Sequence, residues 1–330
     1  MPPELSQSLR ARTDELVAGL GRAAVEAAAE RLSAAYRAKG AGAARAARSE
    51  VDVVAYLAYR APATYAAMLD VLSRLREQRP EWRPSGVLDV GAGPGVASWA
   101  AVAAWPELER VTFVEVEPEM VRLGRALAGV APERALRDAA WITGDASVTA
   151  GPADLVLVSY VLNETLESRV SALATALWGR SLDTIVFLEP GTPDGYTRVL
   201  LARDAVLGEG GVTIAPCPHD LPCPLAPGDW CHFAVRLPRS EAHRVVKGVS
   251  RGFEDEKLSY AALTRSRERR AVSRVIRPPQ IRSGHVYLDL CEPEGIRREV
   301  VTRREKERYR RARKAAWGDA LDLEPTGRGD

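Results

Sequence analysis

The spacing of apolar residues changes near residue 80. Between residues 51 and 75, apolar side chains recur every three or four positions, which predicts helices for the first 80 residues. Pro62 lies inside this stretch, and we expect it to break or kink the helix because proline lacks the amide hydrogen that a helix interior needs. Short apolar runs then alternate with helical stretches. The strand-like runs are 87–90, 111–116, 155–160 and 184–188. We therefore predict an α/β fold, with a parallel sheet covered by helices on both faces.

This regularity weakens after about residue 198, which suggests several parts in the 330-residue chain. We expect an N-terminal helical region (1–80), a Rossmann-like domain (81–210), a cysteine-rich and basic part (211–320) and a disordered tail (321–330). No apolar run reaches the roughly 18 residues that a membrane helix needs, and residues 1–15 are too polar for a secretory signal. We expect a monomer that does not enter membranes.

A glycine-rich turn follows the first predicted strand, which contains Asp89. The turn reads Gly91-Ala92-Gly93-Pro94-Gly95 and leads into a helical run. Glycines allow the backbone to approach a ligand closely, and a helix N-terminus offers unpaired N–H groups, although the spacing is not that of the dinucleotide-binding motif. Glu115 ends the second strand, where a carboxylate can accept hydrogen bonds from both hydroxyls of a ribose. Asp145 precedes the next strand and is expected near an adenine amino group.

Together these residues resemble the motifs of class I S-adenosylmethionine-dependent methyltransferases. The resemblance implies a seven-stranded doubly wound sheet and S-adenosylmethionine as cofactor. The implied cofactor-binding residues are Asp89, Gly91, Gly93, Gly95, Glu115 and Asp145. The alternative is an α/β domain with ordinary glycine turns. The segment after the fourth strand, Ser159 to Glu164, lacks the Asn/Asp-Pro-Pro-aromatic motif of base-nitrogen methyltransferases, and no general base is evident, so no catalytic residue is assigned.

All four cysteines lie in the second half of the chain. Cys217, Cys223 and Cys231 share one proline-rich run, and Cys291 follows a strand-like run sixty residues later. Four thiolates are a suitable ligand set for a tetrahedral zinc ion or an iron–sulfur cluster. Disulfides are the competing interpretation, but they need an oxidising compartment, and inert buried cysteines are another.

The charge is unevenly distributed. The formal net charge is +2, yet residues 236–314 hold 23 Lys and Arg against 11 Asp and Glu. The densest cluster comprises Arg297, Arg298, Arg303, Arg304, Lys306, Arg308, Arg310, Arg311, Arg313 and Lys314. On a helix it would present cations all round, which favours contact with rRNA phosphates. The alternative is a solvated helix with no polyanionic partner.

Several further motifs narrow the family. They are Leu188 to Pro193, Arg203, the cysteine run continuing to Ser240, Glu254 to Tyr260, Arg277-Pro278 and Ala315 to Asp319. This combination resembles the methyltransferase-like proteins of the small ribosomal subunit, known from mitochondria and with bacterial relatives. Residues 1–20 show no mitochondrial targeting peptide, so a bacterial, cytoplasmic member is expected.

The resemblance implies an assembly factor of the small ribosomal subunit that contacts its rRNA and binds S-adenosylmethionine. It also implies a four-iron, four-sulfur cluster held by Cys217, Cys223, Cys231 and Cys291. Two other functions stay open: an active rRNA methyltransferase, and a zinc-stabilised methyltransferase that acts on small molecules. Spacing alone does not separate a zinc site from a cluster.

Overall fold

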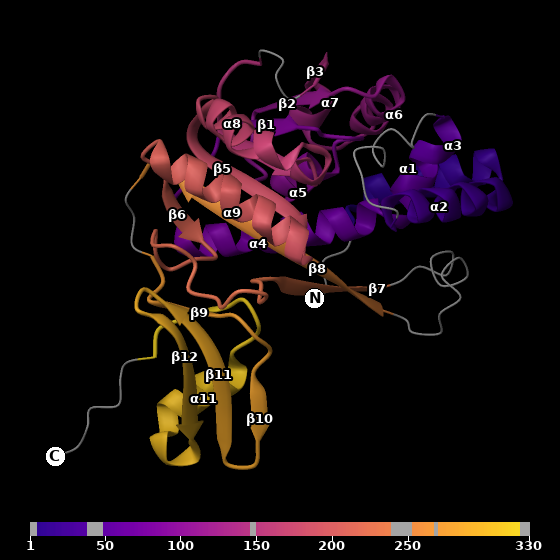
Figure 1. The fold of residues 1–330 in the computed structure, drawn as a ribbon. Helices are drawn as coiled ribbons and strands as arrows, with labels where there is room; N and C mark the ends of the chain where they lie inside the picture. The colour runs from indigo at the N-terminus through magenta and orange to yellow at the C-terminus, as the bar shows by residue number, and fades with distance from the viewer. Residues whose placement is uncertain (1–4, 38–48, 146–149, 239–252, 267–269, 324–330) are drawn as a thin grey trace.

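The computed structural model describes residues 5–37, 49–145, 150–238, 253–266 and 270–323. In Figure 1, a large α/β part occupies the upper half of the view, and a smaller antiparallel β-sheet carrying one helix lies below it. The loop that follows strand β6 and contains three of the cysteines runs between these two parts.

Four helices precede the large sheet. They are α1 (Gln7–Leu20), α2 (Arg22–Arg37), α3 (Glu50–Tyr59) and α4 (Ala61–Gln78). Helix α3 begins at a capping box, in which Ser49 and Asp52 each satisfy a backbone amide of the other. Helix α3 ends directly before α4, which has Pro62 in its first turn, where a missing amide hydrogen costs nothing. The predicted break at Pro62 is confirmed.

The large sheet contains the predicted parallel strands. Its strands are β1 (Gly86–Val90), β2 (Arg110–Glu115), β3 (Ala140–Thr143), β4 (Ala153–Ser159), β5 (Ser181–Pro190), β6 (Val212–Ala215), β7 (Phe233–Pro238) and β8 (Phe253–Thr264). Their order is β3-β2-β1-β4-β5-β8-β6, and β7 pairs with β8. Strands β1 to β5 pair in parallel, whereas β8 is antiparallel to β5, β6 and β7. This is the doubly wound sheet of the class I methyltransferase fold, with β7 added to the expected seven strands.

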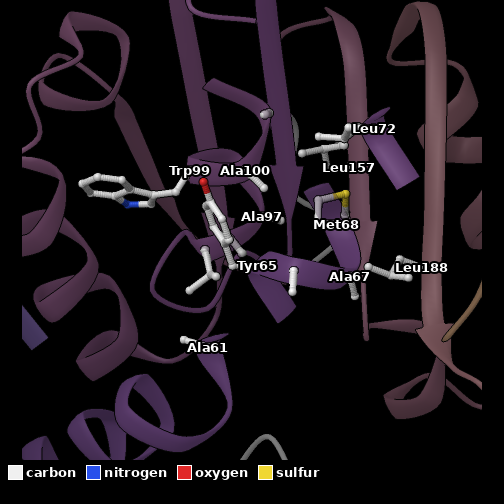
Figure 2. Packing of buried hydrophobic residues seen from close by; sticks show 14 of the residues in the cluster. Ala61, Tyr65, Ala67, Met68, Leu72, Ala97, Trp99, Ala100, Leu157 and Leu188 are labelled. Atoms are coloured by element: carbon white, nitrogen blue, oxygen red, sulfur yellow. The ribbon is translucent and has the colours of Figure 1, made fainter. Parts of the chain in front are cut away.

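Helices cover both faces of this sheet. They are α5 (Val96–Ala104), α6 (Pro118–Ala128), α7 (Arg134–Arg137), α8 (Glu167–Trp178) and α9 (Pro193–Gly208), and a short 3₁₀ turn, η2 (Leu162–Glu164), precedes α8. Figure 2 shows how α4 meets the sheet: Tyr65 and Met68 lie close to Ala97 and Ala100 of α5 and to Leu157 of β4. The N-terminal helices therefore share one hydrophobic core with the Rossmann-like part.

The second sheet folds around its own smaller core. Its elements are β9 (Ser273–Val275), β10 (Gln280–Arg282), β11 (His285–Glu292), β12 (Gly295–Thr302), η3 (Arg303–Glu305), α11 (Lys306–Lys314) and β13 (Ala320–Leu321). Tyr309 and Ala312 of α11 pack on Val286, Leu288 and Leu290 of β11. The predicted helix with cations all round is therefore wrong. Its first third is strand β12, and one face of α11 is buried.

The division into four parts stays a prediction, but two of its boundaries differ from the structure. Strands β6, β7 and β8 belong to the large sheet although they follow residue 210. Leu321 pairs with Ser273, and Leu321 and Leu323 are buried, so the predicted disordered tail cannot begin at residue 321. Residues 324–330 of that tail lie outside the described part. Within the described residues, no helix is both long and apolar enough to cross a membrane.

Candidate functional site

The glycine-rich turn lies at the carboxyl end of β1, where the strand order of the large sheet reverses. Ligands of doubly wound sheets bind at this point. Gly91 has a φ of +66°, and a Cβ atom there would come within 2.3 Å of Val161 Cγ2. Gly95 has a φ of +90°, and its Cβ would come within 2.9 Å of Phe113. Gly93 also has a positive φ, but a Cβ there would meet nothing within 4 Å. The turn thus requires glycine for its backbone, and at Gly91 and Gly95 also for space.

Glu115, at the end of β2, is tied to this turn. Its Oε2 accepts a hydrogen bond of 2.6 Å from the backbone N–H of Gly93. Its Oε1 accepts bonds of 2.8 and 2.9 Å from the backbone N–H groups of Val116 and Glu117. Burial raises the pKa of Glu115, although these three amides counteract the rise. The carboxylate therefore braces the turn in addition to its proposed role toward a ribose.

Asp89 and Asp145 occupy different surroundings. Asp89 is fully buried, and its Oδ2 accepts hydrogen bonds from the backbone N–H and the hydroxyl of Ser98, at 3.2 and 2.8 Å. Its Oδ1 meets no donor among the described residues, and burial raises its pKa to about 7. Asp89 thus links β1 to Ser98 of α5 and stabilises the turn that connects these two elements. Asp145 is exposed beside the undescribed residues 146–149.

Sequence reasoning missed a half-buried polar network beside this turn, formed by Arg60, Tyr160 and Glu256. Tyr160, directly after β4, has a φ of 62°, a conformation that is uncommon outside glycine and concentrated at functional sites. Its hydroxyl donates to Glu256 Oε1 at 3.4 Å, and Arg60 pairs with the same carboxylate at 2.8 Å. The guanidinium of Arg60 also lies over the Tyr160 ring, 5.0 Å from its centre.

Two further carboxyl groups lie at this edge of the sheet. Glu189, at the end of β5, is fully buried; its Oε1 accepts a hydrogen bond from the Leu162 amide at 2.7 Å, and its Oε2 has no partner among the described residues. Burial raises the pKa of Glu189 to about 8. Burial also raises the pKa of Glu164 to about 7, and the nearby charges of Glu115 and Glu117 add to the rise. An environment that accumulates carboxyl groups favours a cationic ligand.

The four cysteines, distant in sequence, line one cavity between α9, β8 and the second sheet. Cys217 and Cys223 lie in the loop after β6, Cys231 directly precedes β7, and Cys291 lies in β11. They form no disulfide, so the disulfide interpretation finds no support. Nowhere in the described residues do three or more His, Cys, Asp or Glu side chains converge as ligands of one metal ion. The cysteines therefore surround a shared space without meeting at one point.

The thiols of this cavity interact with neighbouring side chains. The hydroxyl of Tyr196 donates a hydrogen bond to Cys223 Sγ at 3.1 Å. Nε2 of His219 lies 3.6 Å from Cys291 Sγ. Burial raises the pKa of Cys217, Cys231 and Cys291, the last to about 12, and the nearby thiols add to each rise. His232 does not line the cavity; its ring stacks on Trp230, 5.2 Å between centres.

Two buried arginines also line the cavity. Arg203 of α9 and Arg274 of β9 are each only 1% exposed. Arg203 donates to the carbonyls of His219 and Leu221, and Arg274 to those of Pro216 and Gly318. Nε of Arg203 and Nη2 of Arg274 have no acceptor among the described residues. Arg203 pairs with Asp204 at 2.6 Å, whereas no ion pair of Arg274 with a described residue is present, so the unused donors and above all the Arg274 charge favour an anionic group in the cavity.

Sequence reasoning took Arg203 only as part of a family motif and overlooked Arg274. A signal for Arg203 was present, because it lies on the same helical face as the apolar residues Val199, Ala202 and Val206. Arg274 stands in a three-residue strand, too short for a periodicity to be read. Its role becomes visible only when the second sheet is assembled.

The basic cluster is partly neutralised by ion pairs. Arg297 pairs with Glu292 and Glu299, Arg298 with Asp289, Arg308 with Glu299 and Glu305, and Arg310 with Glu307. Seven exposed cations in this cluster and at the adjoining Arg282 make no ion pair with a described residue: Arg282, Arg303, Arg304, Lys306, Arg311, Arg313 and Lys314. A net positive surface thus remains around η3 and α11.

A comparison with known protein families gives a match over most of the chain. A family model described as the mitochondrial small ribosomal subunit protein Rsm22 matches residues 50–322. The chain belongs to this family. The Rsm22-type match begins at α3 and ends after β13, so it includes the glycine turn, all four cysteines and the second sheet.

Two curated relatives of this Rsm22-family chain come from mitochondria. It is 28% identical over 288 residues to the ribosome assembly protein METTL17 of Homo sapiens, covering 81% of this chain and 62% of the human protein. It is 26% identical over 330 residues to the Rsm22-cox11 tandem protein 2 of Schizosaccharomyces pombe, covering 84% of this chain and 44% of that protein. The chain therefore spans less than two thirds of the length of either relative.

Solved structures of methyltransferases resemble part of the chain. One is a putative RNA methyltransferase of Pyrococcus horikoshii, with 17% identity and a TM-score of 0.40, covering 62% of this chain and 86% of the other. Another is the magnesium protoporphyrin IX methyltransferase of Synechocystis with bound S-adenosylmethionine, with 16% identity and a TM-score of 0.42, covering 62% and 80%.

Proposed function

We propose that this chain acts in assembly of the small ribosomal subunit, as a factor of methyltransferase fold that binds S-adenosylmethionine and rRNA and carries a four-cysteine iron–sulfur cluster. The ribosomal role rests on the family match over residues 50–322. The description of that family names the mitochondrial small ribosomal subunit. The human relative bears the name of a ribosome assembly protein.

The glycine turn supports S-adenosylmethionine as the ligand of the first site. Gly91, Gly93 and Gly95 leave the backbone open to close approach, and Glu115 stands at the end of the neighbouring strand. S-adenosylmethionine carries a positive charge on sulfur, which suits the carboxyl groups of Glu115, Glu164 and Glu189 gathered at this edge. In this proposal Asp89 holds the turn, and Asp145 lies on the adenine side.

The lining of the cysteine cavity suits the implied cluster in its ligands and its charge. Four thiols line it, and a cluster with four thiolate ligands is anionic, which matches the unused donors of Arg203 and Arg274. A single zinc ion would draw all four sulfurs to about 2.3 Å from one point, and the described cysteines do not converge in this way. Four thiolates on a zinc ion would be anionic as well, so the preference for a cluster over zinc rests on the family resemblance that implied it.

When bound, such a cluster supplies covalent links among the loop after β6, the start of β7 and β11. Cys217, Cys223, Cys231 and Cys291 would hold it. Arg203 and Arg274 would balance its negative charge, and Tyr196 and His219, which contact the sulfurs of Cys223 and Cys291, would orient them. The role derived from this chain is thus structural, joining the second sheet to the methyltransferase fold.

The basic surface around η3 and α11 supports rRNA as the partner. Seven cations remain exposed there without an acidic partner in the described residues. Contacts of lysine and arginine with phosphates release counterions, so the affinity of the complex is expected to fall steeply with salt.

The first experiment is anaerobic purification followed by assays of iron, acid-labile sulfide and zinc. We expect brown protein with iron and sulfide in roughly equal amounts, near four per chain. Colourless protein with a single zinc would contradict the cluster and retain the four-cysteine site. Metal-free protein that keeps its fold and its affinity for small-subunit rRNA would contradict the structural role.

A second experiment addresses the partner and the reaction. Affinity for small-subunit rRNA is measured at two salt concentrations, and labelled S-adenosylmethionine is supplied to the same RNA. Salt-sensitive binding is expected; binding without transfer of label supports a cofactor-binding assembly factor. Transfer that is lost in Gly91→Ala and in Glu115→Gln would assign the chain as an active rRNA methyltransferase.

A further inference from the structure

The second sheet has two faces of different character. Val286, Leu288 and Leu290 of β11 point toward α11 and are fully buried. Because side chains alternate along a strand, His285, Tyr287, Asp289 and Cys291 point to the opposite face. The ion pair between Asp289 and Arg298 of β12, at 2.8 Å, lies on that same face. We call it the outer face of the sheet.

The outer face carries aromatic and apolar side chains in reach of solvent. The rings of His285 and Tyr287 meet edge to face, 4.9 Å between centres. Val300, which pairs with Tyr287 across the strands, is 45% exposed, and Ile296, which pairs with Cys291, is 41% exposed. Single exposed apolar side chains are ordinary, but several that adjoin one another on one face are typical of a binding surface.

Cations gather at one end of this face. Arg282 of β10 pairs with His285 across the strands. The backbone N–H of Arg303 donates to the carbonyl of Gly284 at 2.8 Å, which fixes η3 beside the turn between β10 and β11. Arg282, Arg303 and Arg304 are exposed and make no ion pair with a described residue.

We propose that the outer face of the second sheet binds unpaired RNA bases, which stack on Tyr287 and His285 while the adjoining phosphates contact Arg282, Arg303 and Arg304. This inference rests on the proposed rRNA binding and specifies its site and chemistry. Tyr287 and His285 are partly exposed, so each can offer part of its ring to the flat face of a base, and arginines beside them suit the backbone.

Single-stranded RNA fits these observations better than duplex. In a duplex the faces of the bases are stacked on one another, and proteins recognise it mainly by its backbone and minor groove. Binding to RNA phosphates alone would need only the cations of η3 and α11. The aromatic pair of His285 and Tyr287 on the adjoining sheet would then have no function in RNA binding.

The outer face also adjoins the cysteine cavity. Cys291 and Ile296 form a cross-strand pair on this face, and both line the cavity. His285 and Tyr287 lie further along the same strand, toward the cationic end. A group held by Cys291 would therefore anchor the strand that presents the aromatic pair.

The test measures binding of the anaerobically purified full chain to a fluorescent single-stranded oligonucleotide of mixed sequence and to a hairpin duplex of equal length. Tyr287→Ala is expected to weaken single-strand binding roughly tenfold with little change in its salt dependence, because it removes stacking and no charge. Tyr287→Phe keeps the ring and should bind like the parent chain. Phe253→Ala is the matched control, since Phe253 is also an exposed aromatic on a strand, 38% accessible, with Arg236 over its ring.

The charged end is tested separately. The double change Arg303→Ala and Arg304→Ala should lower the slope of log affinity against log salt by about 1.4, because each phosphate contact to a single strand contributes about 0.7. Ultraviolet crosslinking of a uridine-containing strand should attach to the peptide containing Tyr287, which does not depend on the stability of any variant. His285→Ala offers a second loss of stacking if Tyr287→Ala folds poorly.

Equal single-strand affinity in Tyr287→Ala and the parent chain, or no crosslink at Tyr287, would overturn the inference while rRNA binding elsewhere on the chain would still stand. Tighter binding of the duplex than of the single strand would also overturn it. If no RNA binds with salt-sensitive affinity, the proposed function itself fails.

Discussion

The two candidate ligand sites differ in how they are built and in the charge they present. The glycine-turn site is built from the ends of neighbouring strands. Two buried carboxyl oxygens there, Asp89 Oδ1 and Glu189 Oε2, have no hydrogen-bond partner among the described residues. The cysteine cavity joins segments from α9 to β12, and its corresponding groups include the donors Arg203 Nε and Arg274 Nη2.

This difference indicates ligands of opposite charge. Unpaired acceptors and carboxyl groups with raised pKa values are stabilised by a cation, as the sulfonium of S-adenosylmethionine would provide. Unpaired buried guanidinium donors are stabilised by an anion, as a thiolate-bound cluster would provide. Two adjoining parts of one chain thus present opposite charges to their proposed ligands.

The largest effect is expected from removing a buried positive charge at the cysteine cavity. Arg274→Met deletes the hydrogen bonds to the Pro216 and Gly318 carbonyls, which are 2.7 and 3.0 Å long, and leaves Arg203 as the one buried arginine beside the proposed cluster. We expect the free energy of unfolding to fall by about 3 kcal/mol and bound iron and sulfide to drop sharply. Chemical denaturation and metal assays of anaerobically purified protein measure both.

Arg274→Lys is the control, because it keeps the charge while losing part of the hydrogen bonding. It should retain more iron than Arg274→Met. Equal iron content in Arg274→Met and the parent chain would contradict the claim that buried positive charge at the cysteine cavity stabilises an anionic cluster.

The next effect concerns space in the glycine turn. Gly91→Ala places a methyl group 2.3 Å from Val161 Cγ2 in a backbone with φ +66°, and we expect a loss of about 3 kcal/mol and of S-adenosylmethionine binding. Gly93→Ala has a similar positive φ but meets nothing within 4 Å, so about 1 kcal/mol is expected from strain alone. Thermal unfolding and calorimetric titration compare the pair. Equal losses in both variants would mean that backbone conformation, and not the contact with Val161, explains the requirement for glycine.

The buried acid of β5 predicts a pH-dependent stability. The pKa of Glu189 is about 8 in the folded chain against an ordinary value of 4.5. Between these values the folded state keeps a proton that the unfolded state releases, so the free energy of unfolding falls as pH rises from about 4.5 to about 8. Glu189→Gln should flatten this fall by an amount on the order of 2 kcal/mol in ligand-free protein. Denaturant unfolding at a series of pH values measures it; a steeper fall in the variant than in the parent chain would contradict the assignment.

The smallest effect is expected on cofactor affinity. The pKa of Glu164 is about 7, so raising the pH from 6 to 8 adds a negative charge near the proposed ligand. S-adenosylmethionine should bind up to about tenfold more tightly at pH 8, and Glu164→Gln should remove most of this gain. S-adenosylhomocysteine lacks the sulfonium charge and provides the control. The same pH dependence for both ligands would show that the acidic edge does not recognise that charge.

Local sequence patterns predicted much of the glycine-turn site. The apolar runs gave β1, β2, β4 and β5, Pro62 gave the break between α3 and α4, and the glycines marked the turn. These features depend on residues close in sequence, so periodicity and backbone preferences reveal them. The strained Tyr160 and the buried Glu189 were missed because their surroundings come from Glu256 and Leu162 on other segments.

By itself, the sequence determined the fold class, the family motifs and the supply of four thiols and an excess of cations. The tertiary structure decided which of these meet. It brought the four cysteines to one cavity with Arg203 and Arg274, divided the predicted basic helix into β12 and α11, and turned Tyr287 and His285 outward. The physical reason is that burial and electrostatic pairing depend on contacts between segments distant in sequence. Hydrophobic periodicity depends only on residues close together in the sequence, so the sequence alone reveals it.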